Sequence, residues 1–451
     1  MRALGASRTS VATGGILGAN WARDPLWKNA RAVPSLDLRF AENKSLTDAK
    51  TGASLVTFTR ASTGTYVGSD GVLRSATTDE ARFDHNPTTG ESLGLLVEEA
   101  RTNLVLYSEQ FNDATWTKTL VSVSTDAAVA PDGSTTADKL IVNNGSSPTS
   151  ARISQTITKA ATATTYTFTV FAKTGDVTTG NSLQIVATDS VITSNNATSN
   201  FSTATGTVTV AAVANGTFTN ASSSISPLAN GWYRCTLTFT TGTEVSIQTR
   251  LFSRTPTTGD GTRGILLWGA QLEAGAFPTS YIPTTTATAT RAADVASITG
   301  ANFSSWYNQT EGTVFSDCFS TFSATQVLVN IAATAAITAT SAISLSSNLT
   351  SSQKRVRVRD AASADQASLA LGASSSGSRT RIAAAIKAND FAASLDGGTA
   401  VTDTSGTVPT VVLMEIGCAP TGVTLGTQLH RRLTYWPTRL ADTTLQAITQ
   451  P

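Results

Sequence analysis

Strict alternation of apolar and polar side chains is the feature that most limits what this chain can fold into. The segment Thr165–Lys173 alternates in this way, and its apolar side consists of Tyr166, Phe168 and Val170. Successive side chains of a β-strand point to opposite faces of a sheet, so this pattern predicts a half-buried strand. Threonine, which dominates the other side, suits the outer face of such a strand.

The segment Gly231–Thr240 alternates in the same way. Its apolar face consists of Tyr233, Cys235, Leu237 and Phe239. Its other face, which we predict to point outward, consists of Trp232, Arg234, Thr236 and Thr238. Because the two faces of a strand meet different surroundings, Cys235 is expected in a hydrophobic core.

Comparable strand-like runs continue toward the C-terminus, separated by clusters of Gly, Ser, Asn and Asp: Val314–Phe319, Gln326–Ile331, Arg379–Ile386, Val411–Ile416 and Leu433–Trp436. Helical periodicity is scarce, and we predict one short closing helix around Leu445 and Ile448, capped by Asp442. The pattern predicts an all-β fold of tandem antiparallel β-sandwich (jelly-roll) domains with an extended N-terminal arm.

The length of the chain calls for more than one core. Single hydrophobic cores stop growing at about 250–300 residues, and this chain has 451. Hydrophobic residues make up 40% of it, which is enough apolar surface to offset the entropy of folding. Only 14% of the residues are charged, so we expect a surface rich in hydroxyl groups.

Proline and threonine mark the expected domain boundaries. Pro278–Ala292 is predicted to be an extended connector, and another junction is expected near Asn103–Phe111. The predicted parts are an arm (1–33), a small β-rich region (34–104), a jelly roll (105–285) and a second sandwich (286–451). No repeat of fixed period is visible, which disfavours a β-helix.

Charge and cysteine content exclude several classes of partner. The formal net charge is +1, so the chain has no overall field suited to nucleic acid or an anionic membrane. It shows neither a signal peptide nor an apolar run of about 18 residues, so we expect cytoplasmic synthesis and no membrane insertion. The scattered Cys235, Cys318 and Cys418 indicate neither a disulfide framework nor a zinc site, and we expect no cofactor.

Four passages match the pattern of a known family: Thr57–Ser62 (TFTRAS), Gly64–Tyr66 (GTY), Gly94–Tyr107 (GLLVEEARTNLVLY) and Trp268–Ile282 (WGAQLEAGAFPTSYI). They resemble the phage head spike fibre family, which is found on tailed phages and on gene transfer agents. Together with the two modules described next, these matches cover nearly everything from about Pro34 to the end of the chain.

Two further regions resemble known sandwich modules. One module looks like the jelly roll of carbohydrate-binding modules, on the passages Phe111–Trp116, Pro131–Leu140 and Gly231–Tyr233. The other, from Glu311 onward, looks like a concanavalin or laminin-G-like domain, on the passages Ile382–Gly398 and Leu433–Thr449. This second likeness is one of fold, shared by binders, spacers and oligomerisation modules.

The resemblance implies a homo-oligomer, with a trimer favoured, on the surface of a virion that is assembled in the host bacterial cytoplasm. It implies attachment near the N-terminus to a capsid, portal-region or other virion protein. It also implies that the distal sandwiches reach toward a host cell-surface polysaccharide. It transfers no binding site, because the sugar-binding loops vary between such modules.

The predicted arm, residues 1–33, carries a local positive charge, which is usually the mark of a solvated tail. Its two tryptophans lie among basic residues in a segment with too few apolar periods to fold alone, so we expect them to be buried against a partner. The candidate particle-anchoring residues are Trp21, Arg23, Trp27, Lys28 and Arg31.

Aromatic rings are the candidates for holding sugar, because sugars are bound by flat aromatic faces together with hydrogen-bonding groups. Four tryptophans lie beside polar residues or on predicted outward faces, and these are Trp116, Trp232, Trp306 and Trp436. The alternative for each of them is that it seals the edge of a core or a subunit interface.

Residues suited to acid–base chemistry are few, so no catalytic residue is predicted. The chain has only His85 and His430, which lie in different predicted domains, and His430 is expected in an exposed loop. Glu98 and Glu99 would point to opposite faces of a strand, which is wrong for two carboxylates that flank one glycosidic bond. A structural ion pair with Arg101 is favoured instead.

Asp390 and Asp396 could place oxygens around a calcium ion, but Gly397–Gly398 favours a hairpin turn between two strands, so no metal is expected.

Taken together, these observations predict a non-enzymatic structural fibre or head spike subunit that adheres to host surface polysaccharide. Repeated weak contacts on an oligomer add up through effective concentration, so shallow sites suffice. Two alternatives stay open: a polysaccharide depolymerase of the tailspike type, and a capsid decoration protein without a ligand.

Overall fold

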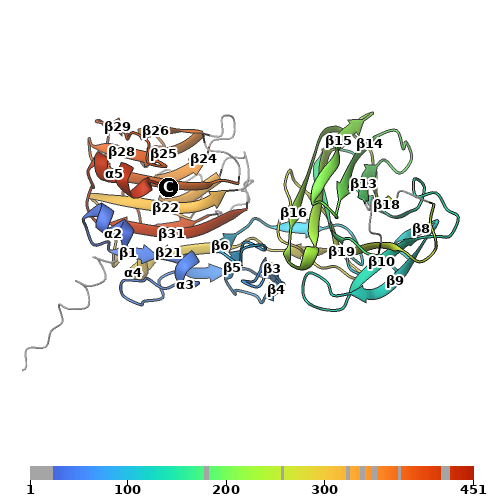
Figure 1. The fold of residues 1–451 in the computed structure, drawn as a ribbon. Coiled ribbons are helices and arrows are strands. Elements are labelled where there is room, and N and C mark those ends of the chain that lie inside the picture. Colours follow the sequence, from blue (N-terminus) through green and yellow to red (C-terminus); the bar gives the residue numbers. More distant parts are fainter. Residues whose placement is uncertain are drawn as a thin grey trace, which may run out of the picture.

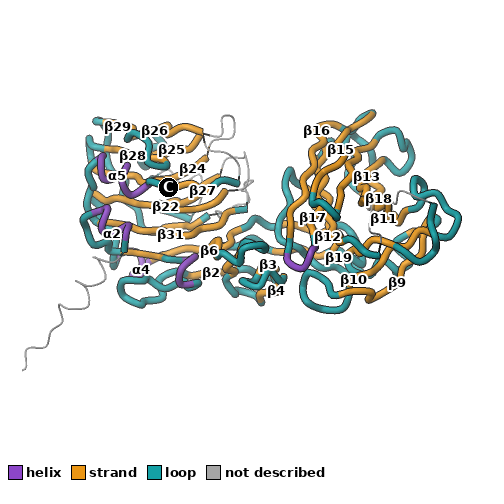
Figure 2. The backbone as a smooth tube through the Cα atoms, viewed as in Figure 1, coloured by secondary structure: helices purple, strands orange, loops and turns teal. Residues whose placement is uncertain are grey.

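Two β-sandwiches lie side by side, and the second is inserted into the first (Figure 1). The computed structural model describes residues 24–176, 182–254, 258–320, 326–335, 341–347, 353–373, 377–417 and 427–451. Strands dominate these residues and helices are few and short, as Figure 2 shows. The predicted all-β class of antiparallel sandwiches is confirmed. No helix in the described ranges is long and apolar enough to cross a membrane.

The first sandwich, called the outer sandwich, is built from both ends of the described chain. One sheet has the order β29 (Val401–Asp403), β28 (Phe391–Leu395), β27 (Arg379–Lys387), β22 (Glu311–Ser320), β31 (Gln428–Trp436), β6 (Ser92–Val97) and β5 (Arg82–His85), with β1 (Leu36–Leu38) also pairing with β31. The facing sheet has the order β2 (Thr57–Thr59), β21 (Val295–Thr299), β30 (Leu413–Ile416), β23 (Gln326–Ala332), β24 (Ala342–Ser347), β25 (Gln353–Arg359) and β26 (Asp365–Ala373).

Alternation explains how these sheets enclose their core. In β25, Val356 and Val358 are buried in the core, whereas Arg355 and Arg357 are partly exposed on the other face. The outward face of the β22–β31 sheet is covered by two helices, α2 (Pro25–Ala30) and α5 (Asp442–Thr449), which pack against it with a smaller apolar cluster. The outer sandwich also carries the short helices α3 (Phe40–Asn43) and α4 (Gly300–Ser304).

The second sandwich, called the inserted sandwich, has two six-stranded sheets. One has the order β16 (Thr219–Pro227), β17 (Tyr233–Thr240), β12 (Thr165–Lys173), β19 (Gly264–Ala274), β10 (Ala137–Val142) and β9 (Val121–Ala128). The other has the order β15 (Thr207–Asn215), β14 (Asn196–Ser202), β13 (Ser182–Thr188), β18 (Ser246–Arg254), β11 (Arg152–Thr158) and β8 (Thr117–Thr119). A single 3-10 turn (Ala229–Gly231) precedes β17.

The predicted inward faces of β12 and β17 are confirmed. Phe168 and Val170 of β12 lie in the core of the inserted sandwich, together with Cys235 and Leu237 of β17. Cys235 is fully buried, and burial raises the pKa of its thiol. The pattern thus identifies the inward side chains, but the prediction of half-buried strands is wrong, because Thr167, Thr169 and Thr236 on the other faces are buried as well.

A two-stranded ribbon joins the sandwiches. Strand β7 (Arg101–Asn103) leads into the inserted sandwich and β20 (Ala289–Arg291) returns from it, and the two strands pair antiparallel with Asn103 opposite Ala289. The hairpin of β3 (Gly64–Val67) and β4 (Leu73–Ala76) lies beside this junction, between the two lobes in Figure 1.

The sheets cut across the boundary that we predicted between residues 34–104 and 286–451. Strands β1, β2 and β6 come from the first of these ranges but pair with strands of the second, and β5 joins the same sheet by pairing with β6. The physical reason is that these short strands have no sheet of their own and complete their hydrogen bonds on the edges of the larger one. The two sandwiches are thus nested rather than consecutive.

Part of the predicted arm belongs to the outer sandwich. The Trp27 ring is 3% exposed, and its Nε1 donates to Asp37 Oδ2 at 3.0 Å. Our expectation that Trp27 has no core of its own chain to fill is therefore wrong: it packs at the base of α2, while Lys28 and Arg31 are exposed. Trp21 and Arg23 lie outside the described residues.

The closing helix forms where we predicted it, with a different cap. Helix α5 begins at Asp442, and Ala441 occupies the cap position. Asp442 instead pairs with Arg439 at 2.6 Å, while Leu445 and Ile448 are buried.

Candidate functional site

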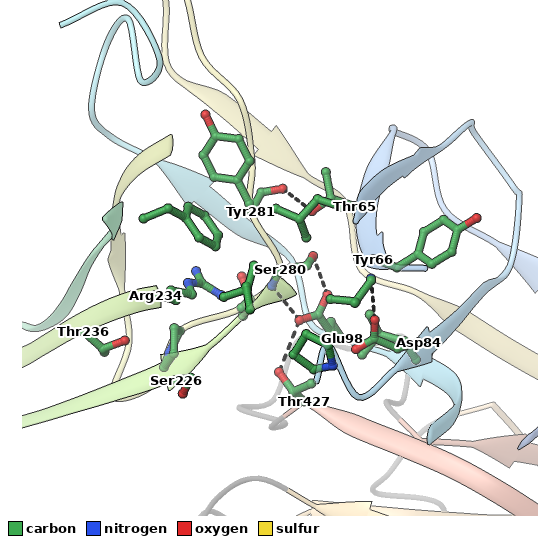
Figure 3. A pocket seen from close by; sticks show the side chains of 18 of the residues that line it. Thr65, Tyr66, Asp84, Glu98, Ser226, Arg234, Thr236, Ser280, Tyr281 and Thr427 are labelled. Carbon is green, nitrogen blue, oxygen red and sulfur yellow. Dashed lines mark hydrogen bonds between the residues drawn. The ribbon is translucent and has the colours of Figure 1, made fainter. Parts of the chain in front are cut away.

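A cleft of about 680 Å³ opens at the junction of the two sandwiches (Figure 3). Its walls come from parts of the chain that are far apart in sequence: the hairpin β3–β4 with β5, the ends of β6 and β31, the strands β16 and β17, and the segment that returns toward β20. Hydroxyl groups are frequent in its lining, from Thr65, Ser224, Ser226, Thr236, Thr279, Ser280 and Thr427. Such a lining can exchange hydrogen bonds with a polyhydroxylated ligand.

Asp84 and Tyr66 lie on the wall formed by the outer sandwich (Figure 3). Asp84 Oδ1 accepts a hydrogen bond from the Val67 backbone N–H at 2.6 Å. Burial raises the pKa of Asp84 to about 7, despite this bond. Near neutral pH its carboxyl group therefore exchanges between an acceptor and a donor.

Glu98 lies between the walls, and its carboxylate is already occupied by protein groups. Ser280 donates to it twice, from its backbone N–H at 2.8 Å and from its hydroxyl at 2.7 Å. Arg82 and Arg291 each lie 2.9 Å from Glu98 Oε2. Burial acts against ionisation, but the two guanidinium groups overcome it and lower the pKa of Glu98 to about 2.

Glu98 belongs to a buried ion cluster that ties the junction together. Asp294 contacts Arg82 at 2.5 Å and Arg60 at 3.1 Å, and it also accepts the Glu98 backbone N–H at 2.8 Å. All three of these arginine and aspartate side chains are fully buried. Because a buried charge is tolerated only when it is paired, the cluster ties Glu98 and Asp294, which flank the ribbon, to Arg82 of β5 and to Arg60 before β3.

Arg234 lies on the opposite wall, on the outward face of β17. Its Nη2 donates to Thr169 Oγ1 at 3.1 Å, and its guanidinium lies 5.5 Å from the centroid of the Phe171 ring. Its Nε is buried and has no hydrogen-bond partner among the described residues. No carboxylate among the described residues forms an ion pair with Arg234. Burial lowers the pKa of its guanidinium.

The four tryptophans that we predicted as sugar-binding candidates are buried, with exposed fractions from 0 to 4%: Trp116, Trp232, Trp306 and Trp436. Our premise that Trp232 and Trp436 face outward into solvent is wrong, because a second layer covers both faces. Trp232 packs in a cluster with Leu73 of β4, and Trp436 lies under α2 and α5. Trp116 packs on Phe111, and Trp306 on Phe303.

The two histidines and Glu99 are held in the fold by burial, a hydrogen bond or an ion pair. His430 lies on β31 and is 1% exposed, so our expectation of an exposed loop is wrong; burial lowers its pKa to about 4. His85 is also buried, and its Nδ1 contacts the Val67 carbonyl oxygen at 3.0 Å. Glu99 forms the predicted ion pair with Arg101.

The loops weighed for calcium are turns. Asp396 and Gly397 both have left-handed backbone angles, and Asp396 Oδ1 accepts the Arg381 backbone N–H at 2.7 Å. Asp390 pairs with Arg439 at 2.8 Å. Across the described ranges, no group of three or more His, Cys, Asp or Glu side chains is arranged to hold a metal ion.

Sequence reasoning missed the cleft because its residues come from distant segments. A signal for one of them was present: Arg234 is the only charged residue in the alternating run Gly231–Thr240, on a face otherwise made of threonine and tryptophan. Asp84 and Ser280 stood in no pattern that predicts a site.

Comparison with known proteins gives only weak similarities. No family model matches the chain, and no curated protein matches it. Among solved structures, the CBM40 of Ruminococcus gnavus IT-sialidase, bound to alpha2,3 sialyllactose, is 15% identical with a TM-score of 0.27, over 32% of this chain and 84% of that one.

Two other similar structures cover more of the chain. Domains LG4-5 of the mouse laminin alpha1 chain are 11% identical with a TM-score of 0.23, over 67% of this chain and 88% of that one. Trypanosoma rangeli sialidase in complex with sialic acid is 12% identical with a TM-score of 0.27, over 71% and 57%. Similarity this weak carries no functional argument, so the assignments that follow rest on the contacts of this chain.

Proposed function

We propose that this chain is a non-enzymatic adhesion subunit that binds surface polysaccharide in the cleft between its two sandwiches. The cleft carries the proposal, because it combines a hydroxyl-rich lining with the partly exposed ring of Tyr66 and the cation of Arg234. Sugars are held by such combinations of hydrogen-bonding groups and flat rings. The binding residues are then those of the cleft rather than the buried tryptophans.

The proposal includes a place for the chain on a particle. By the sequence resemblance, the subunit is a virion fibre or head spike, attached through its N-terminal region to a capsid or portal-region protein and assembled as a homo-oligomer, with a trimer favoured. Lys28 in the last turn of helix α2 and Arg31 directly after it are exposed, and they support a role for this end of the outer sandwich in attachment. Trp27 is excluded from that surface by its burial.

Binding is tested by titrating the purified chain with capsular polysaccharides and by repeating the titration with Ser226→Trp, which fills the cleft from its exposed rim on β16. Ser222→Trp, at another exposed position of the same strand, is the matched control. We expect the first variant to lose binding and the control to keep it. Equal binding by both variants would show that the cleft is not the site.

Attachment is tested separately by removing residues 1–23, which lie before the folded outer sandwich, and by changing Lys28 and Arg31 to Gln in the full chain. We expect reduced incorporation into particles for both. Normal incorporation of both variants would overturn this part of the proposal and leave sugar binding unaffected.

One observation favours a second candidate, a polysaccharide depolymerase. Two carboxyl groups of the cleft have pKa values displaced in opposite directions, Asp84 to about 7 and Glu98 to about 2. Such a displaced pair is typical of glycosidases, in which one group is the acid and the other the nucleophile or base. Against this reading, the Glu98 oxygens are already held by Ser280, Arg82 and Arg291.

Incubation of the chain with a bound polysaccharide separates the two functions. We expect no new reducing ends. Sustained release that is abolished by Asp84→Asn would establish the depolymerase instead.

A further inference from the structure

We infer that Arg234 is the carboxylate-binding residue of the cleft, so that the ligand is an acidic polysaccharide containing uronic acid residues. This inference rests on the proposed function and specifies the substrate class of that same site. It follows from the position of Arg234, from its missing partner and from the groups that surround it.

The position of Arg234 presents its side chain to the cleft. In the sheet, Arg234 lies directly opposite Ser226 of β16 and Phe171 of β12. Residues directly opposite each other share one face of a sheet, so all three line the same wall. The Phe171 ring supports the flat guanidinium from one side, which leaves its edge for a ligand.

The missing partner is the central observation. A desolvated guanidinium without a counterion is costly, and buried arginines elsewhere in the junction are paired with carboxylates, as Arg82 is with Glu98 and Asp294. Among the described residues, Arg234 donates one hydrogen bond, to the neutral Thr169 hydroxyl, and its buried Nε has no partner. A ligand carboxylate would supply the planar, bidentate partner that a guanidinium prefers.

Protein carboxylates near Arg234 are not available to fill this role. Glu273 is fully buried and is held by the Thr279 backbone N–H at 2.9 Å and hydroxyl at 2.8 Å. Glu98 is held by Ser280 and two other arginines. Both attract Arg234 electrostatically without contacting it as an ion pair.

The rest of the cleft suits the remainder of an acidic sugar. Figure 3 shows Ser226 and Thr236 beside Arg234, with Ser280 and Glu98 between it and the wall that carries Asp84 and Tyr66. A ring with its carboxylate on Arg234 therefore meets hydroxyl groups on its own side and acceptors across the cleft. A neutral sugar could use the same hydroxyl groups and acceptors but would leave the Arg234 guanidinium without a counterion.

The experiment compares charged and neutral forms of one ligand. The full chain is titrated calorimetrically with oligogalacturonate, oligoglucuronate and oligomannuronate, each beside the same oligosaccharide after its carboxylates are reduced to alcohols. We expect at least one oligouronate to bind about tenfold or more tighter than its reduced form, as for a charge-assisted hydrogen-bonded pair. Equal affinity of each pair would overturn the inference.

Variants locate the effect. Arg234→Gln should lower the affinity for the oligouronate to that of its reduced form and leave the reduced form unchanged, while Arg234→Lys should retain part of the preference. Arg263→Gln is the matched control, because it removes the same charge from a side chain that is 61% exposed and pairs with Asp260. An equal loss in this control would show nonspecific charge attraction and would overturn the inference.

The outcomes separate this inference from the proposed function. Binding of charged and reduced forms alike, lost in Ser226→Trp, would leave the sugar-binding cleft standing without a carboxylate site. If none of the oligosaccharides or capsular polysaccharides binds, the proposed function itself fails. Should Arg234→Gln not fold, the comparison of ligand forms on the unchanged chain still decides.

Discussion

At the scale of single residues, Asp84 makes the stability of the protein depend on pH. Its folded pKa of about 7 lies above the ordinary value near 4 for an unfolded aspartate. The folded state therefore holds the proton more tightly, and the contribution of Asp84 to stability falls as pH rises between these two values. In Asp84→Asn this decline should be absent, which changes the free energy of unfolding by about 1–3 kcal/mol across the window.

Urea unfolding of both proteins at intervals between about pH 4 and about pH 8 measures this difference. The matched control is Asp70→Asn, since Asp70 is half exposed and pairs with Arg74 at the surface. An identical pH slope in Asp84→Asn and in the unchanged protein would refute the assignment.

Glu98 changes the stability of the protein with pH in the opposite direction to Asp84. Its folded pKa of about 2 lies below the ordinary value, so the stability it contributes is present above about pH 4.3 and is lost as pH falls toward 2. Glu98→Gln should thus flatten the acid side of the stability profile. Tm values measured along an acid titration check this, and an unchanged acid slope would contradict it.

The buried ion cluster gives a further prediction. Asp294→Ala leaves Arg60 and Arg82 buried without one of their counterions, and we expect a loss of about 3–5 kcal/mol in the free energy of unfolding. Asp70→Ala removes a surface pair and should leave the free energy of unfolding nearly unchanged. Denaturant unfolding compares the two, and similar losses would argue against the structural role of the cluster.

At the scale of elements, the ribbon β7–β20 depends on one buried side chain. Asn103 Nδ2 donates to the carbonyl oxygens of Ala270 and Ile282, and its Oδ1 accepts the N–H groups of Val105 and Leu272. The fully buried Asn103 thus satisfies backbone groups of two other segments at the base of the inserted sandwich.

Asn103→Ala leaves those four backbone groups unpaired, and we expect a loss of about 2–4 kcal/mol in stability. Amide hydrogen exchange should increase first in the ribbon and in the segment that returns to it. Thr102→Ala is the control in the same strand, because Thr102 bonds only to Thr290 across the exposed face. Faster exchange in the control than in Asn103→Ala would reject this account.

The elements themselves were largely predictable, and their partners were not. Strands such as β12 can be predicted from the alternation of apolar and polar residues, because this pattern depends only on neighbours in the sequence. The pairing of β6 with β31 joins residues more than three hundred positions apart, and no local pattern encodes it. For the same reason the burial of Trp436 under α2 and α5 could not be read from the strand alone.

At the scale of the whole molecule, nesting predicts that the outer sandwich folds without its insertion. Since Asn103 and Ala289 are paired residues, their Cα atoms lie about 5 Å apart and a short Gly-rich loop can replace residues 104–288. We expect this shortened chain to unfold cooperatively in urea, with lower stability because Glu98 loses Ser280. A chain without a cooperative transition would contradict the nesting of two separate cores.

Residues of the passages that resemble head spike fibres come together at the junction of the two sandwiches. Arg60, Glu98, Gln271, Glu273 and Ser280 come from three of them and meet at the junction. Gly275 lies against Arg101, where a side chain would collide with the guanidinium. The junction thus accounts for these residues by structure, whereas Arg234 lies outside the matched passages.

The antiparallel ribbon also has a mechanical consequence. Two covalent connections join the inserted sandwich to the outer one, and they lie side by side at Asn103 and Ala289. A pull between the two lobes is therefore shared by two strands in parallel, whereas a domain on a single linker would pass the whole tension through one.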